Sequence, residues 1–201
     1  SDLNIRKAFG DDGVSAMLLR CIADEVAPSL THIYQLSLST GQLPDEWRQA
    51  TVSPIFKKGN HTLPSNYRPI SLLSCTSKIL EAVVAAPLYE HVNRFLPKNQ
   101  SGFRKNDGTS SQLVRIIHTI AQALDRGQVV VNCFYDLSKA FDRVWHQGLL
   151  SKLAHLGVGG ALLAWLQAYL TERKQRVRVG SAVSSWKVVP AGVPQGSVLG
   201  R

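Results

Sequence analysis

Cysteine is scarce in this 201-residue sequence, and the three that occur are scattered. Cys21, Cys75 and Cys133 form no CxxC pair and no cluster with histidine, and the six histidines share no metal-ligand spacing. An odd and dispersed set of cysteines argues against a disulfide scaffold or a zinc site and indicates a reducing compartment. We therefore expect an intracellular protein, located in the cytoplasm and the nucleus.

Long apolar runs are also missing, as is a recognisable targeting signal. No run approaches the roughly 18 residues that a membrane span needs, so we expect no membrane partner. Residues 1–4 lack a basic stretch followed by an apolar one, so we expect no secretory signal. The chain also begins without a methionine, and we expect it to be a segment of a longer protein.

The sequence does contain enough apolar material for a core and a marked excess of positive charge. Hydrophobic residues make up 44% and charged residues 18%, which excludes a disordered chain. The net charge of +9 is uneven: residues 1–46 carry three basic and seven acidic side chains, whereas residues 47–80 carry five basic and none acidic. A basic body indicates a polyanionic partner such as nucleic acid, although a solvated basic surface would give the same pattern.

Apolar residues at helical spacing predict much of the regular structure. Ser15 is a candidate N-cap for the first helix, Pro28 is expected to end it, and Gly41 is expected to end the second. Thr109 is expected to cap a later amphipathic helix through its hydroxyl, and the glycines within 157–160 should separate the last two helices. The helices are expected over residues 15–27, 29–39, 76–96, 109–126, 148–156 and 161–171.

Strand patterns occur between these helices. Residues 49–58 and 67–73 are expected to form one basic β-hairpin, and residues 174–179 and 186–189 a second. The apolar run over 128–137 is typical of a buried strand. Helices and strands mixed in this way predict an α+β fold.

A carboxylate closes the strand predicted over 128–137. Alternation places Asp136 on the same face as Val130 and Phe134. An unpaired carboxylate there would cost several kcal/mol, so Asp136 should either meet a cation or lie at the rim of the sheet, where water and metal have access. Taken alone, Asp136 is more commonly explained as an ordinary helix-capping aspartate.

Four motifs in a fixed order extend this observation beyond a single aspartate. They resemble motifs of the reverse transcriptases of non-LTR (LINE-type) retrotransposons, and the resemblance covers nearly the whole chain. Several motifs in order are far more specific than any one of them. The motifs are PIFKKG at 54–59 with NYRPISLL at 66–73, QSGFR at 100–104, FYDLSKAFDRV at 134–144, and GVPQGSVLG at 192–200.

The resemblance implies a particular α+β architecture. It is a reverse-transcriptase-like fingers region followed by a partial palm, in which helices flank an antiparallel sheet. Residues 1–46 would be a short N-terminal helical extension, residues 47–127 the fingers, and residues 128–201 the partial palm, incomplete at its C-terminus.

The resemblance also implies a catalytic centre with two Mg²⁺ ions. Asp136 would be the catalytic carboxylate and a metal ligand, and the backbone carbonyl of Leu137 would supply a second oxygen. Oxygen ligands at the end of a rigid strand suit a hard cation that promotes nucleotidyl transfer.

Five further residues would bind the incoming nucleotide. Phe141 would exclude a 2′-hydroxyl by its bulk, although periodicity alone favours a core aromatic there. Lys57, Lys58 and Arg68 would hold the triphosphate, since guanidinium and ammonium groups stabilise phosphate charge. For Lys57 and Lys58, contact with the template backbone or simple solvation is the alternative. The amide of Gln195 would be held against the nucleotide by a loop made of glycine and proline.

A last group of residues would contact the template or primer, mostly through phosphates. For each cation in it, a solvated charge explains the sequence as well. We expect Asp142 to be structural, either paired with Arg143 or capping the next helix. The template and primer candidates are Arg104, Lys105, Gly196, Arg176 and Arg178, with Arg173 and Lys174 adding to the same basic surface.

The implied function is that of an RNA-directed DNA polymerase, with an RNA template, a DNA primer and deoxynucleoside triphosphates as partners. The family's motif with two adjacent aspartates does not occur within these 201 residues. We therefore expect this chain alone to be inactive. A catalytically dead nucleic-acid-binding remnant is the alternative, and a two-metal nuclease built on Asp136 explains fewer of the motifs.

Overall fold

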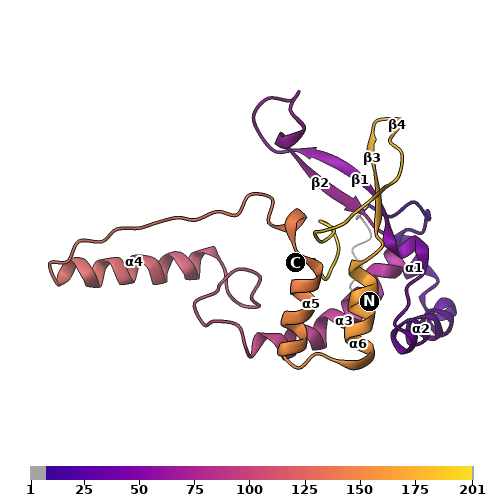
Figure 1. Ribbon diagram of the computed structural model, residues 1–201, viewed down its shortest axis with the longest axis horizontal. Coiled ribbons are helices and arrows are strands. Elements are labelled where there is room, and N and C mark those ends of the chain that lie inside the picture. Colours follow the sequence, from indigo (N-terminus) through magenta and orange to yellow (C-terminus); the bar gives the residue numbers. More distant parts are fainter. Residues whose placement is uncertain (1–7, 201) are drawn as a thin grey trace. The chain divides into compact units, whose positions relative to one another are not determined.

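The computed structural model describes residues 8–200, and the chain forms two compact units (Figure 1). The first comprises Ser1–Tyr89 and Lys139–Arg201, and the second comprises Glu90–Ser138. This division differs from the boundaries at 46 and 127 expected for an extension, fingers and palm, and those boundaries stay a prediction. None of the helices within the described residues is long and apolar enough to cross a membrane.

Two helices open the first unit, α1 (Ala16–Cys21) and α2 (Ala23–Thr40). The predicted caps are confirmed: the Ser15 hydroxyl accepts a hydrogen bond from the Leu18 amide, and Gly41 ends α2 with φ 67°. The predicted break at Pro28 is wrong, because the helix breaks at Ile22 and continues through the proline. Proline removes only one backbone donor, so the hydrogen bonds on either side of it can carry the helix onward.

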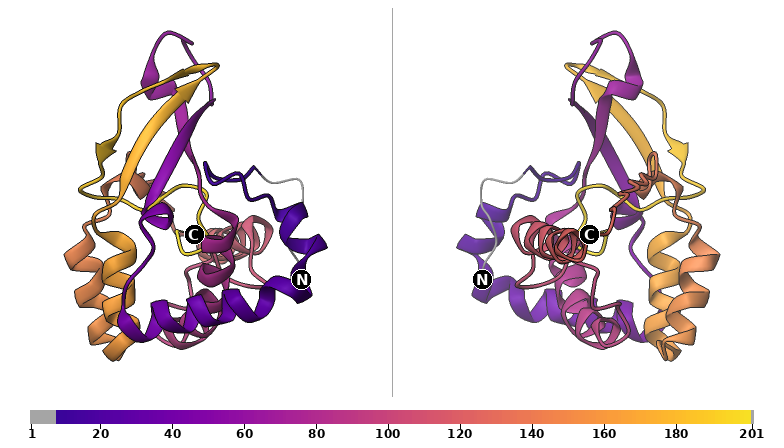
Figure 2. Two further views of the ribbon diagram at one scale, coloured as in Figure 1. Left: turned by 90° about the vertical axis from the view of Figure 1, so that its right-hand side faces the viewer. Right: turned by 90° about the vertical axis from the view of Figure 1, so that its left-hand side faces the viewer.

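The first unit contains one sheet in the order β2-β1-β3-β4, with β5 also paired to β3. Both predicted hairpins are confirmed as antiparallel pairs, β1 with β2 and β3 with β5. Figure 2 shows the β1–β2 hairpin and β3 rising together from the helices of this unit. The strands are β1 (Gln49–Phe56), β2 (Tyr67–Leu72), β3 (Lys174–Val179), β4 (Ala182–Val183) and β5 (Lys187–Val188).

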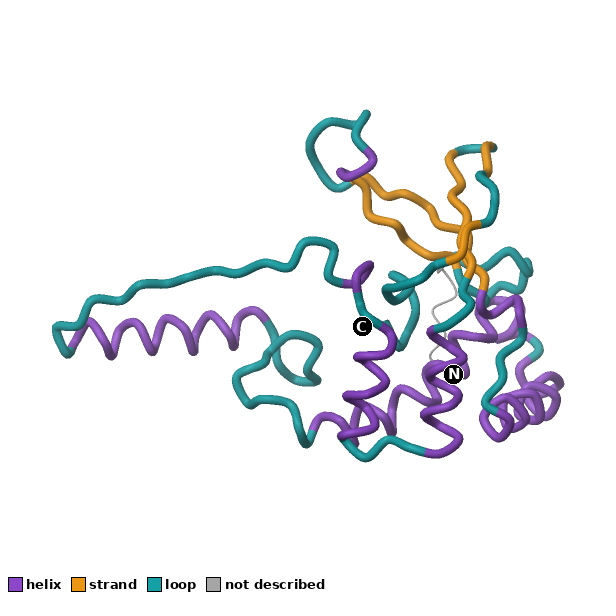
Figure 3. The backbone as a smooth tube through the Cα atoms, in the orientation of Figure 1, coloured by secondary structure: helices purple, strands orange, loops and turns teal. Residues whose placement is uncertain are grey.

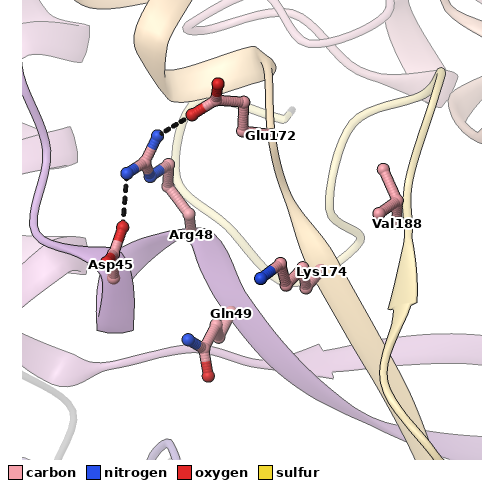
Figure 4. Close-up of a pocket in the computed structure, with 6 residues that line it drawn as sticks. All are labelled: Asp45, Arg48, Gln49, Glu172, Lys174 and Val188. Atoms are coloured by element: carbon pink, nitrogen blue, oxygen red, sulfur yellow. Dashed lines mark hydrogen bonds and ion pairs between the residues drawn. The ribbon is translucent and has the colours of Figure 1, made fainter.

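The sheet is mixed: β3 pairs antiparallel with β4 and β5, within the residues expected to form the antiparallel palm sheet, but it also has a parallel neighbour. Strand β3 pairs in parallel with β1, with Gln49 opposite Lys174. A long connection that includes helices lies between the two strands, and such a crossover is what parallel pairing requires. The side chain of Arg48 joins the two strand starts by pairing with both Asp45 and Glu172, beside a small pocket (Figure 4).

Three helices supply most of the core below the sheet: α3 (Cys75–Asn93), α5 (His146–His155) and α6 (Gly160–Leu170). Leu80 on α3 and Trp165 on α6 are buried in one apolar cluster. The Trp165 indole donates a hydrogen bond of 3.0 Å to the Ser37 hydroxyl and so ties α6 to α2. Short 3₁₀ turns occur at Asp45–Arg48, Pro64–Asn66 and Phe141–Arg143.

The second unit consists of the last residues of α3, from Glu90 onward, then α4 (Thr109–Asp125) and the loops on either side of α4. The amphipathic helix is confirmed, but Gly108 is the N-cap residue in place of the predicted Thr109 hydroxyl. Just before it, the Asp107 carboxylate accepts a hydrogen bond from the Gly108 amide and pairs with Arg115 at 2.7 Å. The Arg115 hydrogen bond is the main reason that the pKa of Asp107 falls to about 2.

The strand predicted over 128–137 is wrong. This segment has no strand structure and follows α4 as a loop (Figure 3). Most of its apolar side chains are exposed, with 90% exposure at Val129 and 89% at Phe134. A strand requires a neighbour for its backbone groups, and no strand of residues 8–200 pairs with this segment.

Candidate active site

A cavity of about 280 Å³ lies on one face of the sheet in the first unit. The strand register places Ala50 of β1, Ser71 of β2 and Gln175 of β3 on this face. Three cations and one carboxylate contribute the charge of the wall. The lining residues are Ala50, Pro69, Ser71, Lys139, Asp142, Arg173, Lys174, Gln175, Val189, Gly192, Val193, Pro194 and Gln195.

The loop that carries Gln195 is hydrogen-bonded to the turn that carries Phe141. The Val193 amide donates to the Phe141 carbonyl and the Gly192 amide to the Val144 carbonyl, both at 2.9 Å. The buried His146 ring donates through Nε2 to the Gly192 carbonyl at 2.7 Å. The structure thus brings together two of the predicted nucleotide-binding residues, which lie far apart in the sequence.

Gly192 is required by this close approach. Its φ is +90°, and a Cβ atom there would lie 2.8 Å from the backbone oxygen of Asp142. Only glycine combines that conformation with so little space.

Gln195 is held from two sides. Its backbone carbonyl accepts a 2.7 Å hydrogen bond from the Ser71 amide, on the free edge of β2. Its side-chain Nε2 donates at 2.8 Å to Oδ1 of Asp142. Asp142 therefore contacts Gln195. The expectation that it pairs with Arg143 or caps the next helix is wrong.

Glu81 anchors the far end of the same loop, and sequence reasoning missed it. Its side chain is 1% exposed on α3, and Oε2 accepts hydrogen bonds from the amides of Val198 at 2.7 Å and Leu199 at 3.3 Å. Burial raises the pKa of Glu81, against the opposing effect of those amides and of Arg173. The sequence did contain a signal for this residue: Glu81 falls at helical spacing on the same face of the helix as Ser77, Leu80 and Val84.

Arg173 is buried, so its expected place on a basic surface is wrong. It is 3% exposed and donates to the carbonyls of Tyr169 at 3.0 Å and Trp47 at 3.4 Å. Its guanidinium lies 5.1 Å from the centre of the Tyr169 ring. Desolvation lowers the pKa of Arg173, while Tyr169 and Glu81 act in the opposite direction. Its neighbour Lys174 is exposed at the cavity wall.

The predicted triphosphate ligands lie on the β1–β2 hairpin. Lys57, Lys58 and Arg68 are exposed, and the Lys57 amide extends the ladder by donating to the Asn66 carbonyl. Arg68 lies opposite Ile55, so alternation places Lys57 and Arg68 on a shared face. That face is opposite the one that carries Pro69 at the Gln195 cavity, so the structure does not place these cations at the cavity wall.

The predicted template and primer residues fall in both units. In the first, Arg176 donates to the Thr51 hydroxyl at 3.0 Å, pairs with Asp11 at 2.8 Å and lies 4.6 Å from the centre of the Trp186 ring. Arg178 is exposed on β3, and Gly196, with φ +122°, lies against the Ser71 carbonyl.

In the second unit, Arg104 is engaged within its own loop. It donates to the Asn93 side chain at 3.2 Å and to the Pro97 carbonyl at 3.2 Å. Lys105 beside it is exposed. These positions leave the predicted contacts with template or primer as predictions.

Asp136 and Leu137 belong to the second unit, in the exposed segment that lacks strand structure. A carboxylate and a backbone carbonyl are hard oxygen donors of the kind that Mg²⁺ prefers. However, the described part of the chain contains no group of three or more His, Cys, Asp or Glu side chains placed to hold a metal. The described residues thus offer suitable donor atoms but not a complete magnesium site.

Comparison with known proteins identifies the family. The model for "Reverse transcriptase (RNA-dependent DNA polymerase)" matches residues 55–200. The chain belongs to the reverse transcriptase family. The matched region includes the whole Gln195 loop, the Phe141 turn and the β1–β2 hairpin from Ile55 onward. The membership predicted from the four motifs is confirmed.

Relatives of this reverse transcriptase chain are proteins of mobile elements. It is 37% identical over 98% of its length to the RNA-directed DNA polymerase from mobile element jockey of Drosophila melanogaster. It is 38% identical, over the same share, to the probable RNA-directed DNA polymerase from transposon BS of that species. A Pol polyprotein from type-1 retrotransposable element R2 of Popillia japonica is 28% identical over 82% of the chain. The chain spans 22% of each Drosophila protein and 23% of the R2 protein.

Replacing Glu81 with alanine should destabilise this reverse transcriptase chain. The substitution leaves two backbone amides without their acceptor and removes the carboxylate that compensates buried Arg173. We expect the free energy of unfolding to fall by about 2–4 kcal/mol, measured by urea denaturation. Glu90→Ala, at an exposed position of the same helix, should change it by less than about 0.5 kcal/mol. Equal effects of the two substitutions would contradict the anchoring role.

Proposed function

We propose that the chain forms the fingers and part of the palm of an RNA-directed DNA polymerase. In this proposal residues 47–127 are the fingers, residues 128–201 the partial palm, and residues 1–46 an N-terminal helical extension. The observation that carries it is the convergence of Phe141, Asp142 and Gln195 through hydrogen bonds between two distant segments. Family membership and the basic charge after residue 46 support the same function.

The cavity beside Gln195 would receive part of the incoming deoxynucleotide. Phe141 would lie beneath its sugar, and the Gln195 amide would contact the nucleotide through hydrogen bonds. Lys139 and Lys174, which line the cavity, would attract the anionic substrate. The triphosphate of the nucleotide would be bound by three residues of the β1–β2 hairpin, Lys57, Lys58 and Arg68. This assignment rests on the sequence motif and not on the cavity.

The reaction would join a primer 3′ oxygen to the α-phosphate of the nucleotide and release pyrophosphate. Asp136 and the Leu137 carbonyl would hold Mg²⁺, and the metal, when bound, would favour deprotonation of the primer hydroxyl and stabilise the leaving group. Further oxygen ligands are needed beyond those of residues 8–200. We therefore expect the isolated 201-residue chain to extend no primer.

An RNA template and a DNA primer would be the macromolecular partners. Arg178, Lys105 and Arg104 would contact their phosphates, and the backbone at Gly196 would approach the template closely. Arg176 would contribute less, because Asp11 already neutralises it. The protein would act inside the cell, in the cytoplasm and the nucleus, where its three free thiols would stay reduced.

A catalytically dead nucleic-acid-binding protein is the second candidate, favoured by the incomplete set of metal ligands. Its affinity for nucleic acid would weaken steeply as the salt concentration rises and would not depend on Mg²⁺. Binding of deoxynucleotides by a working polymerase would instead require the metal.

Replacing Asp136 with asparagine in the full-length protein tests the proposed function. We expect primer extension on an RNA template to fall at least about 1,000-fold, because a neutral amide is a poor ligand for Mg²⁺. Affinity for the primer–template should change less than about twofold. Asp125→Asn, at an exposed aspartate of α4, should leave both unchanged. Extension that survives Asp136→Asn would show that Asp136 is not a metal ligand.

Replacing Phe141 with valine tests the sugar gate. A smaller side chain would leave room for a 2′-hydroxyl, so incorporation of ribonucleotides relative to deoxynucleotides should rise about 10- to 100-fold in the full-length protein. Phe95→Val, at an exposed phenylalanine of the second unit, is the matched control. Unchanged sugar selectivity combined with a lower melting temperature would assign Phe141 to packing.

A further inference from the structure

The contact between Asp142 and Gln195 fixes how the glutamine amide is turned. A carboxylate is only an acceptor, so the amide must direct Nε2 toward Oδ1 of Asp142, at 2.8 Å. The carbonyl Oε1 and the second N–H of Nε2 are then left for another partner. Without the carboxylate, rotation about the last side-chain torsion would exchange oxygen and nitrogen at little cost.

The backbone of Asp142 is itself held in place. Its amide donates to the Lys139 carbonyl at 3.0 Å within the 3₁₀ turn Phe141–Arg143. The carbonyls of Phe141 and Val144, on either side, accept from the Gln195 loop, and Gly192 packs against the Asp142 backbone. A fixed backbone places the carboxylate at a constant position relative to Gln195.

The charge of Asp142 is unfavourable in a cavity that receives part of an anionic nucleotide. The other charged lining residues, Lys139, Arg173 and Lys174, are all cations. A carboxylate among them opposes an anionic substrate, so direct binding of phosphate does not explain Asp142. Orientation of a neighbouring side chain does explain it.

We propose that Asp142 is a positioning residue that acts on the incoming nucleotide only through Gln195. By accepting from Nε2, it presents the Gln195 carbonyl oxygen and one N–H to a deoxynucleoside triphosphate in a single orientation. This inference rests on the proposed function and adds a residue to its substrate-binding site.

A double-mutant cycle in the full-length protein tests this role. Primer extension on an RNA template would be compared for wild type, Asp142→Ala, Gln195→Ala and the double variant, with dGTP as the varied substrate. Each single substitution should raise KM for dGTP about tenfold and change kcat less than about threefold, which corresponds to the loss of one charge-assisted hydrogen bond. The double variant should resemble Gln195→Ala, because Asp142 has no target without the amide.

Two further variants separate positioning from folding. Asp142→Asn keeps an acceptor oxygen without the charge, so its KM should lie between those of wild type and Asp142→Ala at an unchanged melting temperature. Asp125→Ala, on the exposed end of α4, should match wild type.

Each outcome has one interpretation. If the KM effects of the single variants multiply in the double variant, or if Asp142→Ala alters kcat alone, the inference is overturned while the proposed function stands. The inference is also overturned if Asp142→Asn raises KM for dGTP as much as Asp142→Ala does. If the wild-type full-length protein extends no primer, the proposed function fails, and this inference fails with it.

Discussion

The hydrogen bonds between residues 141–144 and residues 192–193 are the constraint on which the rest of the site depends. They join two segments about fifty residues apart through backbone groups, so the side chains that they carry are positioned by the fold. Asp142 and Gln195 line one cavity, with Phe141 next to Asp142 in the chain, because this pairing exists. Gly192 makes the approach possible, since any side chain there would strike the Asp142 backbone.

Two buried side chains of opposite charge lie beside this site: Glu81 anchors the loop, and Arg173 lines the cavity. Glu81 on α3 and Arg173 before β3 are both almost fully buried, and each satisfies backbone groups of other elements. Two desolvated charges are costly, and each is offset here by hydrogen bonds to backbone groups. The cavity therefore has a wall at Arg173 and an anchored loop at Glu81, and each of these charges shifts the pKa of the other toward its charged form.

The sequence predicted those parts of the fold whose signals are local. Such signals depend only on residues that are neighbours in the sequence. They predicted the N-cap at Ser15, the end of α2 at Gly41 and the two hairpins, and all of these are present. The parallel pairing of β1 with β3 was missed because it joins residues more than a hundred positions apart, where no local pattern applies. The Asp142–Gln195 contact and the Glu81 anchor were missed for the same reason, although the motifs had already marked Gln195 and Phe141 for the site.

The predicted strand over 128–137 failed for a different reason, which bears on catalysis. Its apolar alternation is a genuine preference for extended structure, but a strand becomes rigid only when its backbone pairs with a neighbour. Among residues 8–200 it has no such neighbour, and its apolar side chains stay in contact with water. A carboxylate can hold a metal at a constant distance only on rigid backbone. The proposed metal ligand Asp136 therefore depends on a pairing partner for its segment, whereas the Gln195 cavity is already held by hydrogen bonds within its own unit.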